Sequence, residues 1–320
     1  MEIRRLGETG LVASRIGLGL AALGRPAYLD VGRDRDLGSE RTRAAMEARC
    51  REVLDAAYAA GVRYVDVARS YGDAEAFLGA WLEARGRPDV VVGSKWGYAY
   101  VGGWRLDADV QEVKDLSVTA LRRQIAESRR LLGDRLSLYQ IHSATIESGV
   151  FDDREVLDEL WSLRASGLFL GFSTSGPKQA DAIVRGLEER IDGEPLFSTV
   201  QSTWNVLEPS AGPALAEAHA DGRGVLIKEA MANGRLAAAD GPLDSIAGRL
   251  GTTPDRVALA AVLAQPWADV VLSGAVTVPQ VRSNASALDV MLPADALSAM
   301  DALAQPPERY WEDRASLPWR

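Results

Sequence analysis

The sequence predicts an α/β protein that folds as a (β/α)8 TIM barrel with an N-terminal β-hairpin and extra C-terminal helices. Eight short runs rich in β-branched residues alternate with amphipathic segments from one end of the 320-residue chain to the other. Eight strand–helix units in roughly 300 residues fit a barrel better than a doubly wound sheet, which usually needs fewer strands and a second domain. No linker rich in Pro, Gly or Ser divides the chain, so we expect residues 1–320 to form a single barrel domain.

The expected elements follow in chain order. First comes IRRLGETGLVAS (3–14), whose Gly-Glu-Thr-Gly turn between two extended pieces predicts a hairpin that caps the bottom of the barrel. The eight expected barrel strands are residues 14–20, 64–68, 90–96, 136–142, 168–174, 197–204, 224–230 and 269–275.

Segments with the period of a helix lie between these strands, for example residues 45–61, 116–133 and 153–167. Two of these three end on a glycine directly after an apolar residue of the last turn, a common helix stop. Residues 244–251 and 254–265 give two helices between the seventh and eighth strands, one more than the repeat requires.

Composition and charge exclude several classes of protein. Lys and Arg total 36 against 45 Asp and Glu, a formal charge of -9, which argues against a broad nucleic-acid or anionic-membrane surface. The N-terminus has no apolar signal core, no run of about 18 apolar residues occurs, and Cys50 is the only cysteine. We therefore expect a soluble, reduced, cytoplasmic protein with a small-molecule partner, either a monomer or a homo-oligomer.

Four polar side chains follow consecutive predicted strands at the end where a barrel carries its chemistry. Asp66 lies late in the second strand, Lys95 near the end of the third and His142 at the end of the fourth, while Tyr71 lies in the loop after Asp66. Each alone has a structural explanation, such as a helix cap, a solvated lysine or a packed ring. His142 is the sharper signal, because the other of the two histidines, His219, lies at a predicted helix end.

Together these four residues resemble the catalytic tetrad of the aldo-keto reductase superfamily. The resemblance covers nearly the whole chain and rests on the segments RRLGETGLVASRIGLG, DRLSLYQIH, GFSTS, GVLIKEAMANGRL and SGAVTVPQVRSNASAL. It implies a NAD(P)-dependent oxidoreductase that interconverts a carbonyl and its alcohol by hydride transfer.

The tetrad makes physical sense for that reaction. A free tyrosine titrates near about 10, and an ammonium close by is expected to lower this pKa, which is the role we assign to Lys95 beside Tyr71. Asp66 would keep Lys95 charged and oriented, and His142 would hydrogen-bond the carbonyl oxygen. Tyr71 is then the general acid/base, with the hydride supplied by the cofactor.

The resemblance also assigns cofactor contacts and implies no metal site. Lys228 stands where many members carry an aromatic that stacks on nicotinamide, a departure from the family pattern. The full set of expected contacts is Gly19, Leu20, Ala21, Asp66, Ser173, Thr174, Gln201, Lys228, Glu229, Met231, Gly274, Thr277, Gln280 and Asn284.

The adenosine end of the expected cofactor site departs further from the family. Members that prefer NADP(H) usually carry Lys or Arg in the segment occupied here by Val276, Thr277 and Gln280. Only Arg282 lies nearby, and a solvated helix charge explains it. The expected cofactor is therefore NADP(H) or NAD(H), with the preference open.

Aromatic residues in the loops point to a carbonyl compound or a sugar as the substrate. We expect substrate contacts from Tyr28 in an Arg- and Asp-rich insertion after the first strand, and from Trp96, Tyr98, Trp104 and Trp311. The C-terminal tail, which also contains Trp319, either folds over the barrel mouth or covers a helix.

Four further functions compete with carbonyl reduction. A sugar dehydrogenase that oxidises a lactol would use the same tetrad. A non-catalytic, nicotinamide-binding regulatory barrel would keep the cofactor loops, but the intact tetrad argues against it. A phosphosugar isomerase would leave the tetrad unexplained, and GLGLAALG (17–24) has the wrong glycine spacing for a Rossmann dehydrogenase.

Overall fold

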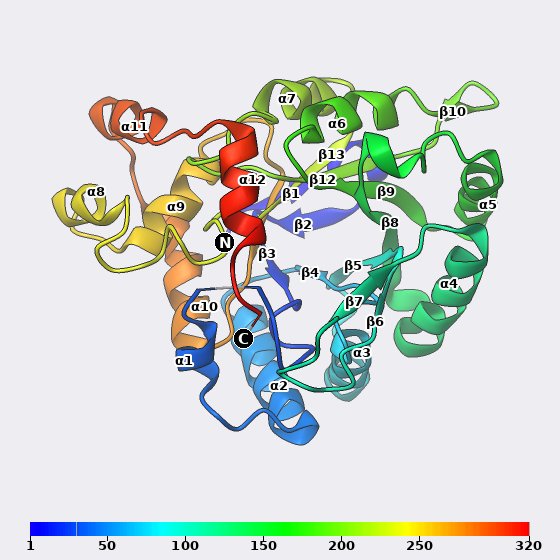
Figure 1. Ribbon diagram of the computed structural model, residues 1–320, viewed down its shortest axis with the longest axis horizontal. Coiled ribbons are helices and arrows are strands. Elements are labelled where there is room, and N and C mark those ends of the chain that lie inside the picture. Colours follow the sequence, from blue (N-terminus) through cyan, green and yellow to red (C-terminus); the bar gives the residue numbers. More distant parts are fainter. Residues whose placement is uncertain (30, 320) are drawn as a thin grey trace.

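The computed structural model describes residues 1–29 and 31–319. Its centre is a closed barrel of parallel strands in the order β12-β13-β14-β3-β4-β5-β8-β9 (Figure 1). The barrel strands are β3 (Ile16–Gly19), β4 (Tyr64–Asp66), β5 (Val91–Trp96), β8 (Leu136–Ala144), β9 (Phe169–Thr174), β12 (Thr199–Thr203), β13 (Gly224–Lys228) and β14 (Val270–Ser273). Each lies within or overlaps its predicted range, which confirms the (β/α)8 fold.

Helices surround the barrel. They include α2 (Arg43–Ala59), α3 (Ala74–Arg85), α4 (Val118–Leu132), α5 (Arg154–Arg164), α6 (Gln179–Leu187), α7 (Gly212–Ala220), α8 (Asp244–Arg249), α9 (Pro254–Leu263) and α10 (Val278–Ala285). The three helices predicted as examples and the additional helix pair before the eighth strand are confirmed. Local signals set their ends: α4 begins where Ser117 Oγ accepts the Ala120 N–H and stops at Gly133.

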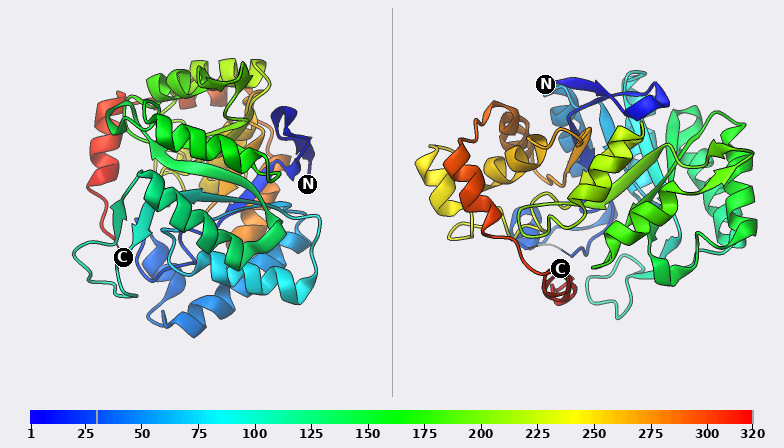
Figure 2. Two further views of the ribbon diagram at one scale, coloured as in Figure 1. Left: turned by 90° about the vertical axis from the view of Figure 1, so that its right-hand side faces the viewer. Right: turned by 90° about the horizontal axis from the view of Figure 1, so that it is seen from above.

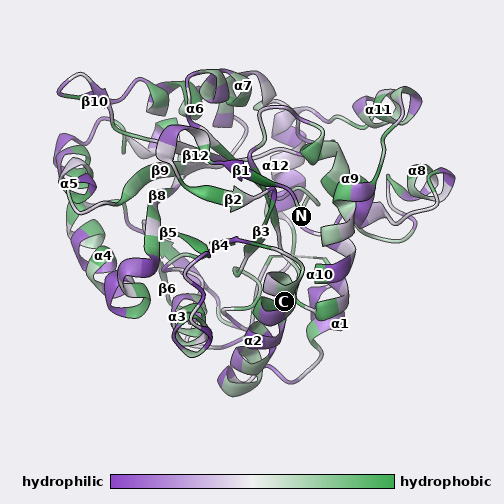
Figure 3. Ribbon diagram, turned by 180° about the vertical axis from the view of Figure 1, so that it is seen from behind, coloured by the Kyte–Doolittle hydropathy of each residue, from purple (hydrophilic) through white to green (hydrophobic). Residues whose placement is uncertain are grey.

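The N-terminal hairpin covers the amino ends of the barrel strands, as predicted. Strands β1 (Ile3–Arg5) and β2 (Val12–Ser14) are antiparallel and flank the short 3-10 helix η1 (Gly7–Thr9). The Glu8 N–H donates to Gly222 O at 2.9 Å, just ahead of β13. Leu6 is fully buried in a cluster with residues inside the barrel. In the view from this side, the barrel strands are coloured mostly hydrophobic, whereas the helices carry both colours (Figure 3).

The other end of the barrel is covered by segments outside the repeat. These are α1 (Arg33–Leu37), the hairpin β6 (Tyr98–Tyr100) with β7 (Glu112–Lys114), and the C-terminal helix α12 (Pro307–Ala315). Helix α11 (Ala294–Asp301) packs instead in a cluster with α8 and α9. The N and C ends lie on opposite sides of the barrel (Figure 2). An isolated bridge pairs Leu29 with Trp319. The tail therefore folds over the barrel mouth, one of the two arrangements expected.

Shorter elements complete the chain: β10 (Arg190–Ile191) and β11 (Glu194–Pro195), and the 3-10 helices η2 (Gly133–Arg135), η3 (Ile146–Ser148) and η4 (Ser286–Asp289). Within the described part of the chain, every helix is too short or too polar to cross a bilayer.

Candidate active site

The four predicted tetrad residues meet at the carboxyl ends of neighbouring strands. Asp66 ends β4, Lys95 lies in β5 and His142 in β8. Lys95 Nζ donates to Asp66 Oδ1 and lies 3.5 Å from Tyr71 Oη. The rings of Tyr71 and His142 meet edge to face with their centroids 5.5 Å apart. Residues that are far apart in the sequence thus form one compact cluster.

The Asp66–Lys95 ion pair is buried and well supported. The two side chains are 3% and 1% exposed. Lys95 also donates to Val67 O at 3.1 Å, and Gln201 Nε2 donates to the second Asp66 oxygen at 2.9 Å. A buried charge pair is tolerated when further hydrogen bonds satisfy its remaining atoms, as they do here.

Burial governs the acidity of the cluster. Burial and the charges of Lys95 and Lys228 hold the pKa of His142 well below its usual 6.5, so its imidazole is neutral at pH 7. Burial lowers the pKa of Lys95, and Asp66 opposes that effect. Burial and the Asp66 carboxylate raise the pKa of Tyr71 well above 10.0, with Arg25 acting in the opposite direction.

The raised pKa of Tyr71 corrects the expectation that Lys95 lowers it. The reason is that burial and the negative charge of Asp66 both disfavour tyrosinate, and together they outweigh the attraction of the Lys95 ammonium. Tyr71 is therefore a protonated phenol at neutral pH.

Arg25, in the loop after β3, is a site residue that the sequence analysis did not identify. Its guanidinium is 2% exposed and donates to Ser70 O at 2.9 Å and Glu112 Oε2 at 2.7 Å. It lies 5.5 Å from the centre of the Tyr71 ring and 4.8 Å from that of Trp319. The only signal was the Arg-rich composition of the insertion, and composition does not show which arginine points inward.

A cavity of about 680 Å³ extends from the tetrad to the start of α10. This volume falls in the usual range for small-molecule sites. It is lined by Tyr71, His142 and these predicted cofactor residues: Gly19, Ala21, Asp66, Gln201, Lys228, Glu229, Met231, Gly274, Gln280 and Asn284.

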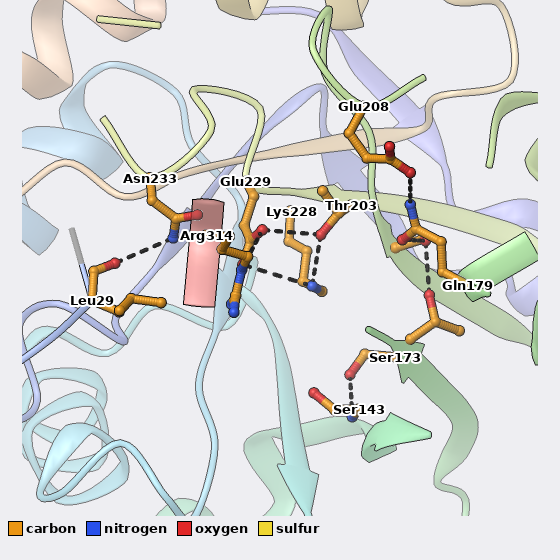
Figure 4. A network of polar contacts seen from close by, with 12 residues as sticks. Leu29, Ser143, Ser173, Gln179, Thr203, Glu208, Lys228, Glu229, Asn233 and Arg314 are labelled. Carbon is orange, nitrogen blue, oxygen red and sulfur yellow. Dashed lines mark hydrogen bonds and ion pairs between the residues drawn. The ribbon is translucent and has the colours of Figure 1, made fainter. Parts of the chain in front are cut away.

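Four predicted cofactor residues lie behind the cavity wall instead. Leu20 is fully buried. Ser173 Oγ accepts the Ser143 N–H at 2.9 Å (Figure 4), and Thr174 Oγ1 is 2.8 Å from Ser202 Oγ. Thr277 caps α10 by accepting the Gln280 N–H. The structure gives these side chains roles in holding the wall.

Of the predicted substrate contacts, Tyr28 lines the cavity. Tyr98 packs against His142, with the two ring centroids 5.1 Å apart. Trp96 is completely buried in the core, since successive residues of β5 point to opposite faces and Lys95 takes the inward one. Trp104 packs on Phe77, and Trp311 lies in the cluster with Tyr310. The structure thus places Trp96, Trp104 and Trp311 away from the cavity.

Lys228 and Glu229 connect the end of β13 to the C-terminal helix (Figure 4). Lys228 Nζ donates to Thr203 Oγ1 at 2.8 Å. Arg314 of α12 donates to the Glu229 carboxylate from both Nε and Nη2, at 2.9 and 2.5 Å. Burial lowers the pKa of Lys228 to about 8. Although burial alone would raise the pKa of Glu229, Arg314 and Lys228 lower it to about 2.

The fold is a (β/α)8 barrel, and ionisable side chains gather at the carboxyl ends of its strands. The chain matches the Aldo/keto reductase family over residues 15–305, and it belongs to that family. It is 26% identical to an uncharacterised oxidoreductase of Bacillus subtilis (strain 168), over 90% of this chain and 91% of that one. It is also 26% identical to the D-threo-aldose 1-dehydrogenase of a Pseudomonas species, over 79% of this chain and 78% of that one.

A solved structure shares the fold. The holo form of an aldo-keto reductase from Bacillus halodurans superposes with a TM-score of 0.71 at 22% identity, covering 96% of this chain and 97% of that one. At that identity the likeness supports the architecture alone.

Proposed function

We propose that this protein is a NAD(P)-dependent oxidoreductase that interconverts a carbonyl and its alcohol, with Tyr71 as the general acid/base. One observation carries the proposal: Tyr71, His142 and Asp66 line one cavity, and Lys95, paired with Asp66, lies 3.5 Å from Tyr71 Oη. Family membership supports the reaction class.

The cavity fits a nicotinamide dinucleotide. Near the tetrad it is lined by Gln201, and near α10 it is lined by Gln280 and Asn284. Between them, Gly274 leaves open space where a side chain would project. When bound, the cofactor supplies or accepts the hydride.

The protein's own groups would manage the proton. Tyr71, protonated at neutral pH, donates its proton to the substrate oxygen as negative charge develops there. Lys95 at 3.5 Å stabilises the resulting tyrosinate, and Asp66 holds Lys95 in place. The neutral His142 donates a hydrogen bond to the same oxygen and orients the substrate.

A second candidate is oxidation of a sugar at its lactol carbon. The similarity to D-threo-aldose 1-dehydrogenase supports it, and so do the charged groups around Tyr71, where Arg25, Glu112 and Lys228 line the cavity and suit hydroxyl groups. In this direction Tyr71 would first release its own proton to solvent; the tyrosinate would then take the proton of the lactol hydroxyl while the hydride passes to the oxidised nicotinamide.

The test is a panel of aldehydes, ketones and aldoses, assayed in both directions at the absorbance band of reduced nicotinamide. Tyr71→Phe should lower kcat by at least about a hundredfold while keeping nucleotide binding, since only the proton donor is removed. Tyr58→Phe is the matched control, because Tyr58 donates to Asp89 on the surface at 3.0 Å, away from the cavity. Unchanged turnover in Tyr71→Phe would contradict the assigned role.

A further inference from the structure

The insertion after β3 places an acidic side chain at the far end of the cavity. We call the part lined by Gly274, Gln280 and Asn284 the α10 end. Asp36, from helix α1, lines the same part of the cavity. Gln280 Nε2 donates to Asp36 Oδ2 at 2.6 Å, so this carboxylate is fixed against the first turn of α10.

Several contacts hold Asp36 in that position. The Val31 N–H donates to Asn233 O at 3.0 Å, and Asn233 Nδ2 donates to Leu29 O at 3.2 Å (Figure 4), which ties the insertion to the loop after β13. On the other side, Arg49 of α2 donates to Asp36 O at 3.1 Å. The carboxylate is therefore presented by a braced segment and is only 23% exposed.

The amide groups at the start of α10 already have partners. Gln280 Oε1 accepts the N–H groups of Val276 and Thr277, and Thr277 Oγ1 accepts the Gln280 N–H. A helix N-terminus binds phosphate through free N–H groups. Here the side chains of Thr277 and Gln280 occupy the N–H group of Gln280 and those of Val276 and Thr277 just ahead of the helix. The arrangement of Gln280 that caps the helix is also the one that aims its Nε2 at Asp36.

The two arginines of α1 that line the cavity are engaged elsewhere or exposed. Asp255 adds a second carboxylate to the cavity wall. Arg33 is buried and donates to Ala22 O, Pro26 O and Arg25 O. Arg35 also lines the cavity, but its side chain is 84% exposed and its Nε lies 3.4 Å from Asp36, a contact of little energy.

We infer that Asp36 makes the protein selective for NAD(H) over NADP(H). A ribose 2′-hydroxyl can donate a hydrogen bond to the carboxylate, whereas a 2′-phosphate would be repelled by it. The same logic operates where an acidic residue binds the ribose 2′-hydroxyl in unrelated dinucleotide folds. This inference rests on the proposed function, since it requires the cavity to hold a nicotinamide dinucleotide.

Fluorescence titration of the purified protein with NADH and with NADPH tests it without turnover. We expect the NADH dissociation constant to be at least about tenfold below that for NADPH. Asp36→Asn should reduce this preference about tenfold or more by removing the like charge. Asp34→Asn is the matched control, because it removes the same charge from the same helix at a position that does not line the cavity, and the preference should persist.

The outcomes separate the two proposals. Failure to bind either nucleotide overturns the proposed function and this inference with it. Binding of NADPH as tightly as NADH, or an unchanged preference in a folded Asp36→Asn protein, overturns the inference alone. Arg35→Gln checks the opposite assignment: selective loss of NADPH binding would show that Arg35 binds a 2′-phosphate, which also overturns it.

Discussion

Arg314→Met should destabilise the protein because it removes the partner of a buried carboxylate. Glu229 is 8% exposed and receives hydrogen bonds from two nitrogens of Arg314, which is 24% exposed. The methionine keeps most of the apolar stem that packs in this region, so the change isolates the charge and its hydrogen bonds. Breaking a buried pair from one side costs about 3–5 kcal/mol.

The acidity of Glu229 gives an independent estimate. Its pKa is lowered from 4.5 to about 2, which corresponds to about 3 kcal/mol of preference for the ionised form in the folded state. Because the folded pKa is the lower one, this stabilisation is complete above pH 4.5 and is lost as the pH falls towards 2. Lys228 lies 3.9 Å from Glu229, and its positive charge would still stabilise the Glu229 carboxylate in part when Arg314 is replaced. We therefore expect a loss of about 3 kcal/mol at pH 7.

Urea unfolding of the wild type and the variant at several pH values measures this difference. Arg309→Met is the matched control: it lies on the same helix, is 67% exposed, and pairs with Asp313 four residues on, so its loss should stay below about 0.5 kcal/mol. The difference between wild type and Arg314→Met should shrink between pH 5 and pH 3. Equal stabilities of the two variants at pH 7, or a difference independent of pH, would refute the reasoning.

Two further predictions concern stability. Gly7→Ala should lower the free energy of unfolding by more than about 2 kcal/mol, because Gly7 has φ +54° and a Cβ there would lie 2.3 Å from Gly224 N. The control Gly10→Ala, at φ +78° with open space around it, should cost only about 1 kcal/mol in the same thermal melts. Similar melting temperatures for the two variants would contradict the close packing of the hairpin on the barrel. Lys228→Met should stabilise the protein by about 1–3 kcal/mol at pH 7, because burial lowers the pKa of Lys228 from 10.5 to about 8. The cost of burying the charged lysine is full below pH 8 and vanishes above pH 10.5. A stabilisation that persists at pH 11 would have another cause.

The residues at strand ends were predictable because barrel geometry leaves little freedom. Once β4, β5 and β8 are placed as consecutive parallel neighbours, Asp66, Lys95 and His142 must meet at one rim. The same rule, applied to alternation along β5, would have excluded Trp96 from the cavity, since it follows the inward-facing Lys95. Aromatic character alone is therefore a weaker guide to a binding site than the face a strand presents.

Acidity was less predictable than position. The sequence indicates that an ammonium lies near Tyr71, but the pKa of a phenol depends on its burial and on every charge around it. Asp66 partly cancels Lys95, and burial raises the pKa of Tyr71 further. Neither effect can be read from residue spacing, because both arise from contacts made by the folded chain.

The segments that escape prediction are those that lie outside the barrel repeat, and several of their side chains line the cavity. Arg25 and Asp36 come from the insertion after β3, and Trp319 comes from the tail. Each is positioned by partners distant in sequence: Arg25 by Glu112, Asp36 by Gln280, and Trp319 by the bridge to Leu29. The hydrophobic periodicity of the sequence predicts neither where these side chains point nor how deeply they are buried. If the proposed function is correct, the repeat supplies the residues that move the proton, whereas the non-repeating segments supply charges that can distinguish one ligand from another.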